Sequence, residues 1–222
     1  MTWTVTLKQL RAAGACISGY NKLIHSLQGK PFTEADWLRE FHIRFAHKEE
    51  IHLGFILDSN GLDDALWAAR CVVGHDRDLR LFAVWCARQV AHHMTDRRSL
   101  AAIDVAEKFA NGAATVQELA GAEQDARSAA NDITAKVAIQ ADAPWAAPWA
   151  AAWAAADAAW LDAGIAARTA CNDAADATGI AARTACNDDE EARKEARQAQ
   201  EAMFRQMLAG TAPWQTPTEE AK

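Results

Sequence analysis

The chain is poor in the residues that build sheets. It has a single tyrosine and few consecutive β-branched residues among its 222 residues, and aromatic and β-branched side chains are the ones that favour strands. It also has no uninterrupted apolar stretch of about 18 residues, so we expect no membrane-spanning helix. The amino terminus lacks a basic segment followed by an apolar run, which is the pattern of a secretory signal. These absences favour an all-α protein without a membrane anchor.

The chain also lacks an excess of positive charge. Its formal net charge is −7 and its isoelectric point is about 5.5, so it has no surplus of basic groups to release counterions from a nucleic-acid backbone. We therefore do not expect a nucleic-acid partner. The five cysteines form no CxxC pair, and this usage is typical of reduced thiols. We expect a cytoplasmic protein.

Alanine dominates the last third of the sequence. Between Ala141 and Ala202, 26 of 62 residues are alanine, the best helix former, and the decapeptide that begins at Gly164 returns unchanged at Gly179. We therefore expect a helical extension over residues 143–209. An unbroken helix of this length measures about 90 Å, whereas a domain of about 140 residues is only about 30–35 Å across. The extension either protrudes from the domain or folds back on it as a hairpin.

Two apolar features indicate how this extension is used. Trp149, Trp153 and Trp160 fall on one stripe of a helix, and we expect this stripe to anchor the extension on the domain. Near the end, pairs such as Glu201 and Arg205, four residues apart, allow a helix to stand in solvent. A terminal apolar patch predicts a docking point or a dimer contact, and its residues are Met203, Phe204, Met207 and Leu208.

Residues 1–142 have the pattern of a compact domain of short helices, and residues 210–222 that of a flexible tail. Thr6 is an N-cap for the first helix, and Ser18 starts a second. A third helix starts at Thr33. Its apolar face is expected to carry Trp37, Phe41, Phe45 and Ile51.

The later helices of this domain are marked by the same capping chemistry. Asp76 is the predicted N-cap of a helix over residues 79–92, whose broad apolar face predicts a central position. Asp96 opens the next helix. Thr115 and Glu118 have the spacing of a capping box for a helix that runs toward residue 140.

No set of residues in the sequence has the pattern of a catalytic or metal site. Cys71 and His75 have the spacing of two ligands on one helix face, with His92 or His93 as a candidate third ligand. However, Gly74 interrupts this helix, and the CxxC spacing of a zinc site is missing. The nucleophile motif GxSxG and the phosphate loop GxxxxGK are absent as well. We therefore expect no enzyme activity, no metal and no cofactor.

The densest polar cluster occurs at the starts of two consecutive helices. One hypothesis is that its residues come together in space as a corner that recognises a protein partner or an anion. The alternative is that they cap the helices and pair across a helical hairpin, which alone explains the acidic positions. The candidate binding residues are His75, Asp76, Arg77, Arg80, Asp96, Arg97 and Arg98.

The same part of the chain carries a resemblance to a known family. The residues concerned are 79–88 (LRLFAVWCAR), 95–99 (TDRRS), 102, 105–107, 110–115 and 118–119. This pattern of about 40 residues resembles a family of bacterial and phage proteins labelled immunity proteins, which also end in Ala-rich, Trp-containing tails. Residues 7–60 resemble its phage-borne branch. The resemblance implies an inhibitor of another macromolecule and brings no catalytic residues.

We predict from these features a non-catalytic protein from a phage or another mobile element. It binds a protein target, a host defence enzyme or a toxin, and blocks it. Two other functions fit the sequence. One is a self-associating scaffold, because small alanine side chains let helices approach closely. Its partner is then a second copy of the chain. In the third hypothesis, the arginines and tryptophans sequester a nucleotide or another small ligand.

Overall fold

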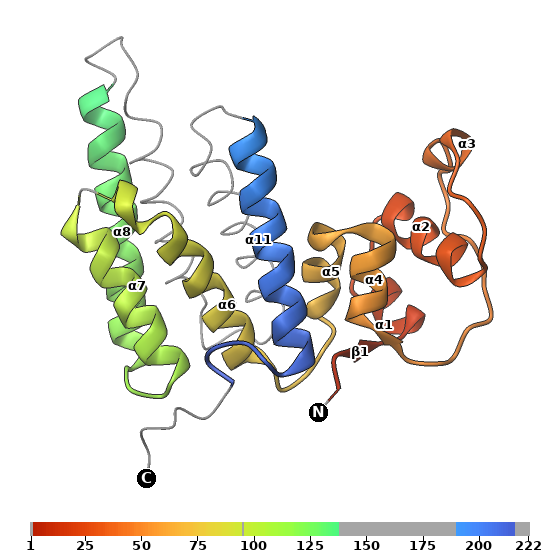
Figure 1. Ribbon diagram of the computed structural model, residues 1–222, viewed down its shortest axis with the longest axis horizontal. Coiled ribbons are helices and arrows are strands. Elements are labelled where there is room, and N and C mark those ends of the chain that lie inside the picture. Colours follow the sequence, from red (N-terminus) through yellow and green to blue (C-terminus); the bar gives the residue numbers. More distant parts are fainter. Residues whose placement is uncertain (1, 95, 138–189, 216–222) are drawn as a thin grey trace. The chain divides into compact units, whose positions relative to one another are not determined.

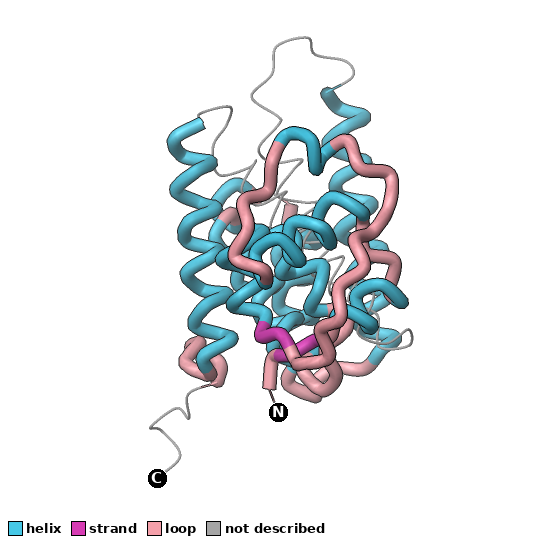
Figure 2. The backbone as a smooth tube through the Cα atoms, turned by 90° about the vertical axis from the view of Figure 1, so that its right-hand side faces the viewer, coloured by secondary structure: helices cyan, strands magenta, loops and turns pink. Residues whose placement is uncertain are grey.

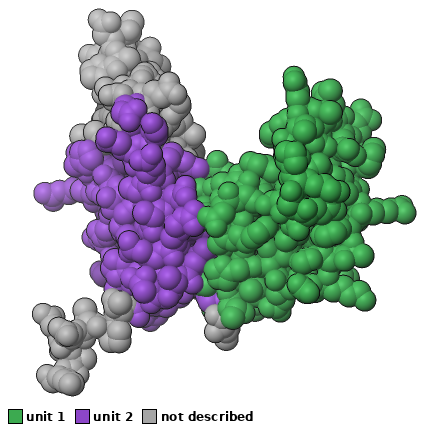
Figure 3. All heavy atoms as spheres, turned by 45° about the vertical axis from the view of Figure 1, so that its right-hand side comes forward, with its two compact units in different colours: residues 1–74 green, residues 75–222 purple. Residues whose placement is uncertain are grey.

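The fold is all-α, as the sequence predicts. The structure, a computed structural model, describes residues 2–94, 96–137 and 190–215. These residues are mainly helical, with two strands of two residues each (Figures 1 and 2). The chain divides into two units, residues 1–74 and 75–222 (Figure 3). The division falls inside the segment 1–142, which the sequence predicts as a single domain.

Unit 1 begins with a short antiparallel sheet. Strand β1 (Thr4–Val5) pairs with strand β2 (Ile51–His52), and the side chains of Val5 and Ile51, which lie opposite each other, are buried. The Leu53 amide extends the pairing by donating to the Trp3 carbonyl at 2.8 Å. The sheet therefore fixes the end of the long segment that precedes residue 51.

Two helices follow the first strand, α1 (Leu7–Ala12) and α2 (Ile17–Leu27). The predicted cap of α1 is confirmed, because the Thr6 hydroxyl accepts from the Gln9 amide and the Gln9 side chain accepts from the Thr6 amide. Helix α2 begins close to the predicted start. Its N-cap is Cys16, whose sulfur accepts a backbone amide hydrogen of the first turn.

Helices α4 (Leu53–Asn60) and α5 (Leu62–Ala69) complete unit 1. Gly61 separates them with a φ of +99°, a conformation that favours glycine. Helix α4 packs against both α2 and α5. Asn60 joins the three helices, because its Nδ2 donates to the Gly19 carbonyl at 2.8 Å and to the Asp64 carboxylate at 2.7 Å.

The third predicted helix is much shorter than expected. Helix α3 contains only Glu34–Trp37, and an irregular loop over residues 38–50 leads from it to β2. The prediction of one helix through Phe41, Phe45 and Ile51 is therefore wrong. Ile51 lies in the sheet because it pairs with β1, and the buried Asn21 side chain of α2 binds the loop backbone at Phe41 and Ile43.

In its described residues, unit 2 consists of helices that contact one another in series (Figure 1). They are α6 (Asp76–Gln89), the 3₁₀ turn η1 (Ala91–His93), α7 (Arg97–Ala110), α8 (Val116–Val137) and α11 (Glu190–Ala209). Helix α7 contacts α6 and α8, and α11 contacts α6. Helix α6 is thus central, as predicted, and its buried residues include Leu79, Phe82, Ala83 and Cys86.

Two predicted caps start the next two helices of unit 2. Asp96 caps α7, because its Oδ1 accepts from the Arg98 amide at 2.9 Å. The capping box of α8 is also confirmed. The Glu118 amide donates to the Thr115 hydroxyl at 3.2 Å, and the Thr115 amide donates to the Glu118 carboxylate at 2.7 Å. Hydrogen bonds from Thr115 lower the pKa of Glu118, and the bond from the Thr115 backbone amide has the largest effect.

Helix α11 confirms that the end of the Ala-rich region is helical and corrects the role of its apolar residues. Phe204 and Met207 are fully buried, and the Phe204 ring packs edge-on against Phe82 of α6, with 5.5 Å between the ring centroids. The predicted ion pair between Glu201 and Arg205 forms at 2.8 Å. The prediction that this patch is a docking point or a dimer contact is therefore wrong, because Phe204 and Met207 at its centre belong to the core of unit 2.

The first residues of the predicted flexible tail are held against unit 2. Ala212 is buried, and Gln215 Nε2 donates to the Met207 carbonyl at 3.2 Å. Residues 138–189, with the tryptophan stripe and the repeated decapeptide, and residues 216–222 lie outside the described residues. Among the helices that the structure does describe, none has both the length and the apolar character needed to span a membrane.

Candidate binding surface

The seven predicted binding residues do not form one corner. They lie at the starts of α6 and α7, and these two helices run antiparallel. Arg77 at the start of α6 bonds to Asn111 just beyond α7, whereas Arg88 near the end of α6 bonds to Asp104 at 3.0 Å. Since α6 has 14 residues and is about 20 Å long, the two halves of the predicted corner lie at opposite ends of the helix pair. The hypothesis of a single recognition corner is wrong.

The first two of these residues form the start of α6. His75 is the N-cap in place of the predicted Asp76, which is the first residue of the helix. The Nδ1 of His75 lies 3.6 Å from the Asp78 carboxylate, and one carboxylate oxygen of Asp76 is buried. Both side chains are turned toward their own unit.

The two candidate arginines of α6, Arg77 and Arg80, contact the end of α7 and the C-terminal turn. Arg77 donates to the Asn111 side chain at 2.8 Å and to the Trp214 carbonyl at 3.3 Å. The Arg80 guanidinium lies over the Phe109 ring, 5.0 Å from its centroid. These contacts tie α6 to two other parts of unit 2, so the arginines hold the unit together.

At the start of α7, Arg98 links the N-cap residue Asp96 to helix α8. Arg98 Nη2 donates to Asp96 at 2.8 Å and to Asp132 of α8 at 2.6 Å. These hydrogen bonds raise the pKa of Arg98, and the bond to Asp96 has the largest effect. Arg97 is exposed. Contacts within their own unit are made by five of the seven residues, His75, Arg77, Arg80, Asp96 and Arg98. These contacts favour the alternative that the residues are caps and interhelical pairs.

A different surface, in unit 1, has the character of a binding site. Trp37, Leu38 and Phe41 are large and apolar, yet 61%, 80% and 63% of their surface is exposed. Arg39 and Arg44 lie in the same segment, and both are exposed. We call residues 37–44 the α3-loop surface; α3 stands apart from the other helices of unit 1 (Figure 1). Exposed apolar residues that gather in this way mark interaction sites, whereas scattered ones do not.

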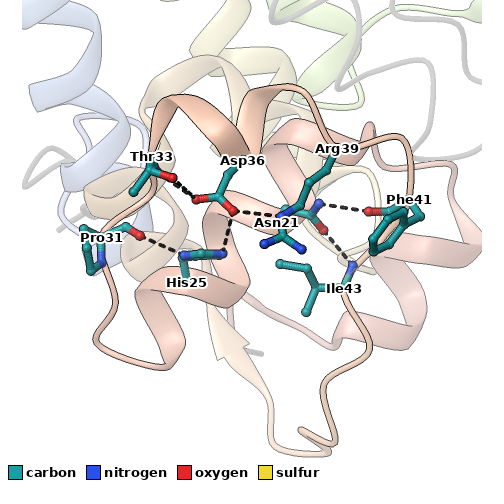
Figure 4. Close-up of polar contacts among 8 residues, drawn as sticks. All are labelled: Asn21, His25, Pro31, Thr33, Asp36, Arg39, Phe41 and Ile43. Atoms are coloured by element: carbon teal, nitrogen blue, oxygen red, sulfur yellow. Dashed lines mark hydrogen bonds and ion pairs between the residues drawn. The ribbon is translucent and has the colours of Figure 1, made fainter.

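A network around Asp36 holds the first part of this surface (Figure 4). Asp36 is 3% exposed, and its Oδ2 accepts from the hydroxyl of Thr33 at 2.7 Å and from the Thr33 amide at 2.9 Å. Its Oδ1 accepts from Arg39 Nε at 2.9 Å and lies 3.4 Å from His25 Nε2 of α2. The hydrogen bonds from Thr33 are the main cause that lowers the pKa of Asp36 to about 2. The ionised carboxylate therefore links α3 to α2 at neutral pH.

Asn21 of α2 holds the second part of the surface. Its side chain is fully buried, Nδ2 donates to the Phe41 carbonyl at 3.0 Å, and Oδ1 accepts from the Ile43 amide at 2.8 Å (Figure 4). The Asn21 side chain thus forms the hydrogen bonds that the Phe41 carbonyl and the Ile43 amide would otherwise form within a longer helix. This pairing explains why residues 41–43 are not helical.

A pocket of about 680 Å³ lies in this part of unit 1. It is lined by Arg11 of α1 and by residues 39–44 of the loop, so that Arg39, His42 and Arg44 all contribute to it. Its volume falls within the usual range of about 300–1,000 Å³ for binding pockets. Guanidinium groups at its wall suit the recognition of an anionic group.

Contacts with α1 and α2 position the basic wall of the pocket. His42 Nε2 donates to the Ala15 carbonyl at 2.9 Å, and the His42 ring meets the buried Tyr20 ring edge-on, with 5.0 Å between centroids. The Arg11 guanidinium lies 5.9 Å from the centroid of the same tyrosine ring. The side chains of His42 and Arg11, both of which line the pocket, therefore pack against the Tyr20 ring.

Burial limits the chemistry of one cysteine in unit 2. Cys86 is fully buried, and burial raises the pKa of its thiol, so the nucleophilic thiolate is disfavoured. Among the residues that the structure describes, no group of three or more His, Cys, Asp or Glu side chains is placed to hold a metal ion. Arginines beside exposed aromatic rings, as in the α3-loop surface, are the groups that protein interfaces use.

Sequence reasoning missed this surface because it placed Trp37 and Phe41 on the buried face of a helix. The available signal was Asn21, a polar residue at a core position of α2 beside Tyr20 and near Leu23. A buried asparagine requires hydrogen-bond partners, and no partner is available within an apolar helix face. Its partners are 20 and 22 residues away, which the spacing of apolar residues does not reveal.

The structure thus defines an all-α protein with an exposed surface of aromatic, aliphatic and arginine side chains. Compared with models of protein families, with curated proteins and with solved structures, the chain matches none of them. The resemblance of residues 79–119 to the immunity-protein family stays a prediction.

Proposed function

We propose that this chain is a non-catalytic cytoplasmic protein that binds a protein target through the α3-loop surface and blocks it. The observation that carries the proposal is the exposure of three large apolar side chains, with two arginines in the same segment. Tryptophan and arginine are enriched at the energetic centres of protein interfaces. Because Asn21 and Asp36 fix the backbone from within, the surface is ordered before the partner docks, and this lowers the entropic cost of binding.

The target that we infer is a host defence enzyme or a toxin, and the chain is its inhibitor, encoded by a phage or another mobile element. The resemblance of residues 79–119 to immunity proteins supports this proposal. The composition of the Ala-rich region also supports it, because alanine offers no functional group for catalysis.

The proposal predicts that substitutions in the α3-loop surface abolish capture of the target. With the tagged full chain as bait in the native bacterial host, we expect one stoichiometric protein partner. Trp37→Ala and Phe41→Ala should each weaken binding of the purified partner about thirtyfold, since truncation of an interface anchor costs about 2 kcal/mol or more. Isothermal titration calorimetry measures the change in Kd.

Val73→Ala is the matched control, because Val73 is 81% exposed in the same unit but lies outside the surface. It should bind like the unaltered chain. A partner that binds all three variants equally would refute the proposed surface. A homo-oligomer without a partner would favour the scaffold, and ultraviolet-absorbing material retained after purification would favour the ligand-sequestering protein.

A further inference from the structure

The pocket of the α3-loop surface has a small excess of positive charge. Arg39 is already paired with Asp36 at 2.9 Å. Within the described part of the chain, neither Arg11 nor Arg44 forms an ion pair with a carboxylate. Glu40 is the acidic residue that shares the lining with them. Two guanidinium groups beside one carboxylate leave these three side chains with one uncompensated positive charge.

An apolar group accompanies this charge. Phe41 also lines the pocket and is 63% exposed, and its backbone is held by Asn21. A ligand that reaches the arginines therefore also meets an aromatic ring. Trp37 and Leu38, which are exposed as well, precede the pocket residues on the same segment.

We propose that this pocket binds an acidic peptide segment of the target, in which an Asp or Glu stands next to an apolar residue. The inference rests on the proposed function and names the chemistry of the partner. Guanidinium groups bind carboxylates through paired, charge-assisted hydrogen bonds, and Phe41 receives the apolar neighbour.

Two observations favour a peptide over a phosphorylated small molecule. One uncompensated positive charge matches a single carboxylate, whereas a nucleotide brings several negative charges to the same wall and also meets Glu40. A small ligand is usually buried over most of its surface. Two of the three exposed apolar side chains of this segment, Trp37 and Leu38, lie outside the pocket lining, which suits a polypeptide that contacts more than the pocket.

The test uses a library of random twelve-residue peptides displayed for selection on the full chain. We expect enriched peptides to carry an acidic residue beside an apolar one. A fluorescein-labelled copy of one such peptide should bind Arg44→Gln and Arg11→Gln at least about tenfold more weakly than the unaltered chain, as judged by fluorescence anisotropy. Replacing the acidic residue of the peptide by its amide should cause a similar loss.

Lys48→Gln is the matched control, because Lys48 is an exposed basic residue of the same loop that does not line the pocket. Its affinity should change less than twofold, which separates pocket binding from general charge attraction. The far-UV circular dichroism of each variant, compared with that of the unaltered chain, shows whether the arginine substitutions disturb folding.

Other results overturn the inference in distinguishable ways. Enriched peptides without acidic residues that still lose affinity with Phe41→Ala would refute the inference and leave the proposed function standing. Peptides that bind all variants equally, or no enrichment at all, would count against both. Displacement of the labelled peptide by inorganic phosphate or ATP at micromolar concentration would assign the pocket to a phosphorylated ligand instead.

Discussion

Phe204→Ala should lower the free energy of unfolding by about 3–5 kcal/mol, the cost of removing a fully buried phenylalanine. Phe204 is 0% exposed and packs edge-on against Phe82 of α6, with 5.5 Å between ring centroids. These two residues belong to helices that are far apart in the sequence, so the contact joins the end of the Ala-rich region to the centre of unit 2. Removal of the ring leaves a cavity between α6 and α11.

Urea unfolding followed by far-UV circular dichroism measures this change. Gln206→Ala is the control, because Gln206 is exposed on the same helix, and we expect a change within about 0.5 kcal/mol. If Phe204→Ala is as stable as Gln206→Ala, α11 does not pack on α6. The apolar end of the helix would then be available as a docking patch, as the sequence alone predicts.

Asn21→Ala should destabilise unit 1 by about 2–4 kcal/mol, because it removes two hydrogen bonds of a fully buried side chain and leaves two part-buried backbone groups without that partner. The amide of Ile43 and the carbonyl of Phe41 both bond to the Asn21 side chain. Their loss should release the loop from α2. Since the loop carries the α3-loop surface, binding of the target should weaken together with stability.

Hydrogen exchange measures the local part of this effect. The Ile43 amide should be protected in the unaltered chain and should exchange much faster in Asn21→Ala under native conditions. Ser26→Ala, on the same helix and half-buried, should leave Ile43 protected. Equal protection of Ile43 in both variants would show that Asn21 does not hold the loop.

Local chemistry made part of this fold predictable. The Thr6 cap and the capping box of Thr115 and Glu118 start their helices as predicted, because such caps depend only on residues about three positions apart. Asp96 caps α7 for the same reason. Such features require no knowledge of how the helices pack.

Features that depend on packing were not predictable in this way. Helix α3 ends early because Asn21, about 20 residues earlier in the chain, binds the backbone that follows it. The predicted corner is split between two ends, because consecutive helices joined by a short connection run antiparallel. This places the start of one helix beside the end of the other. Met207 is buried because α11 packs on α6, although its sequence context is that of an exposed helix end.

Photo-cross-linking in the native host tests the central claim most directly, namely that the α3-loop surface binds a protein target. The chain is produced with the photoreactive residue p-benzoylphenylalanine at position 41, or at position 73 as a control, and the cells are irradiated. We predict a covalent product with one host or toxin protein for position 41 and none for position 73. No product at position 41, or a product only between copies of this chain, would contradict the claim.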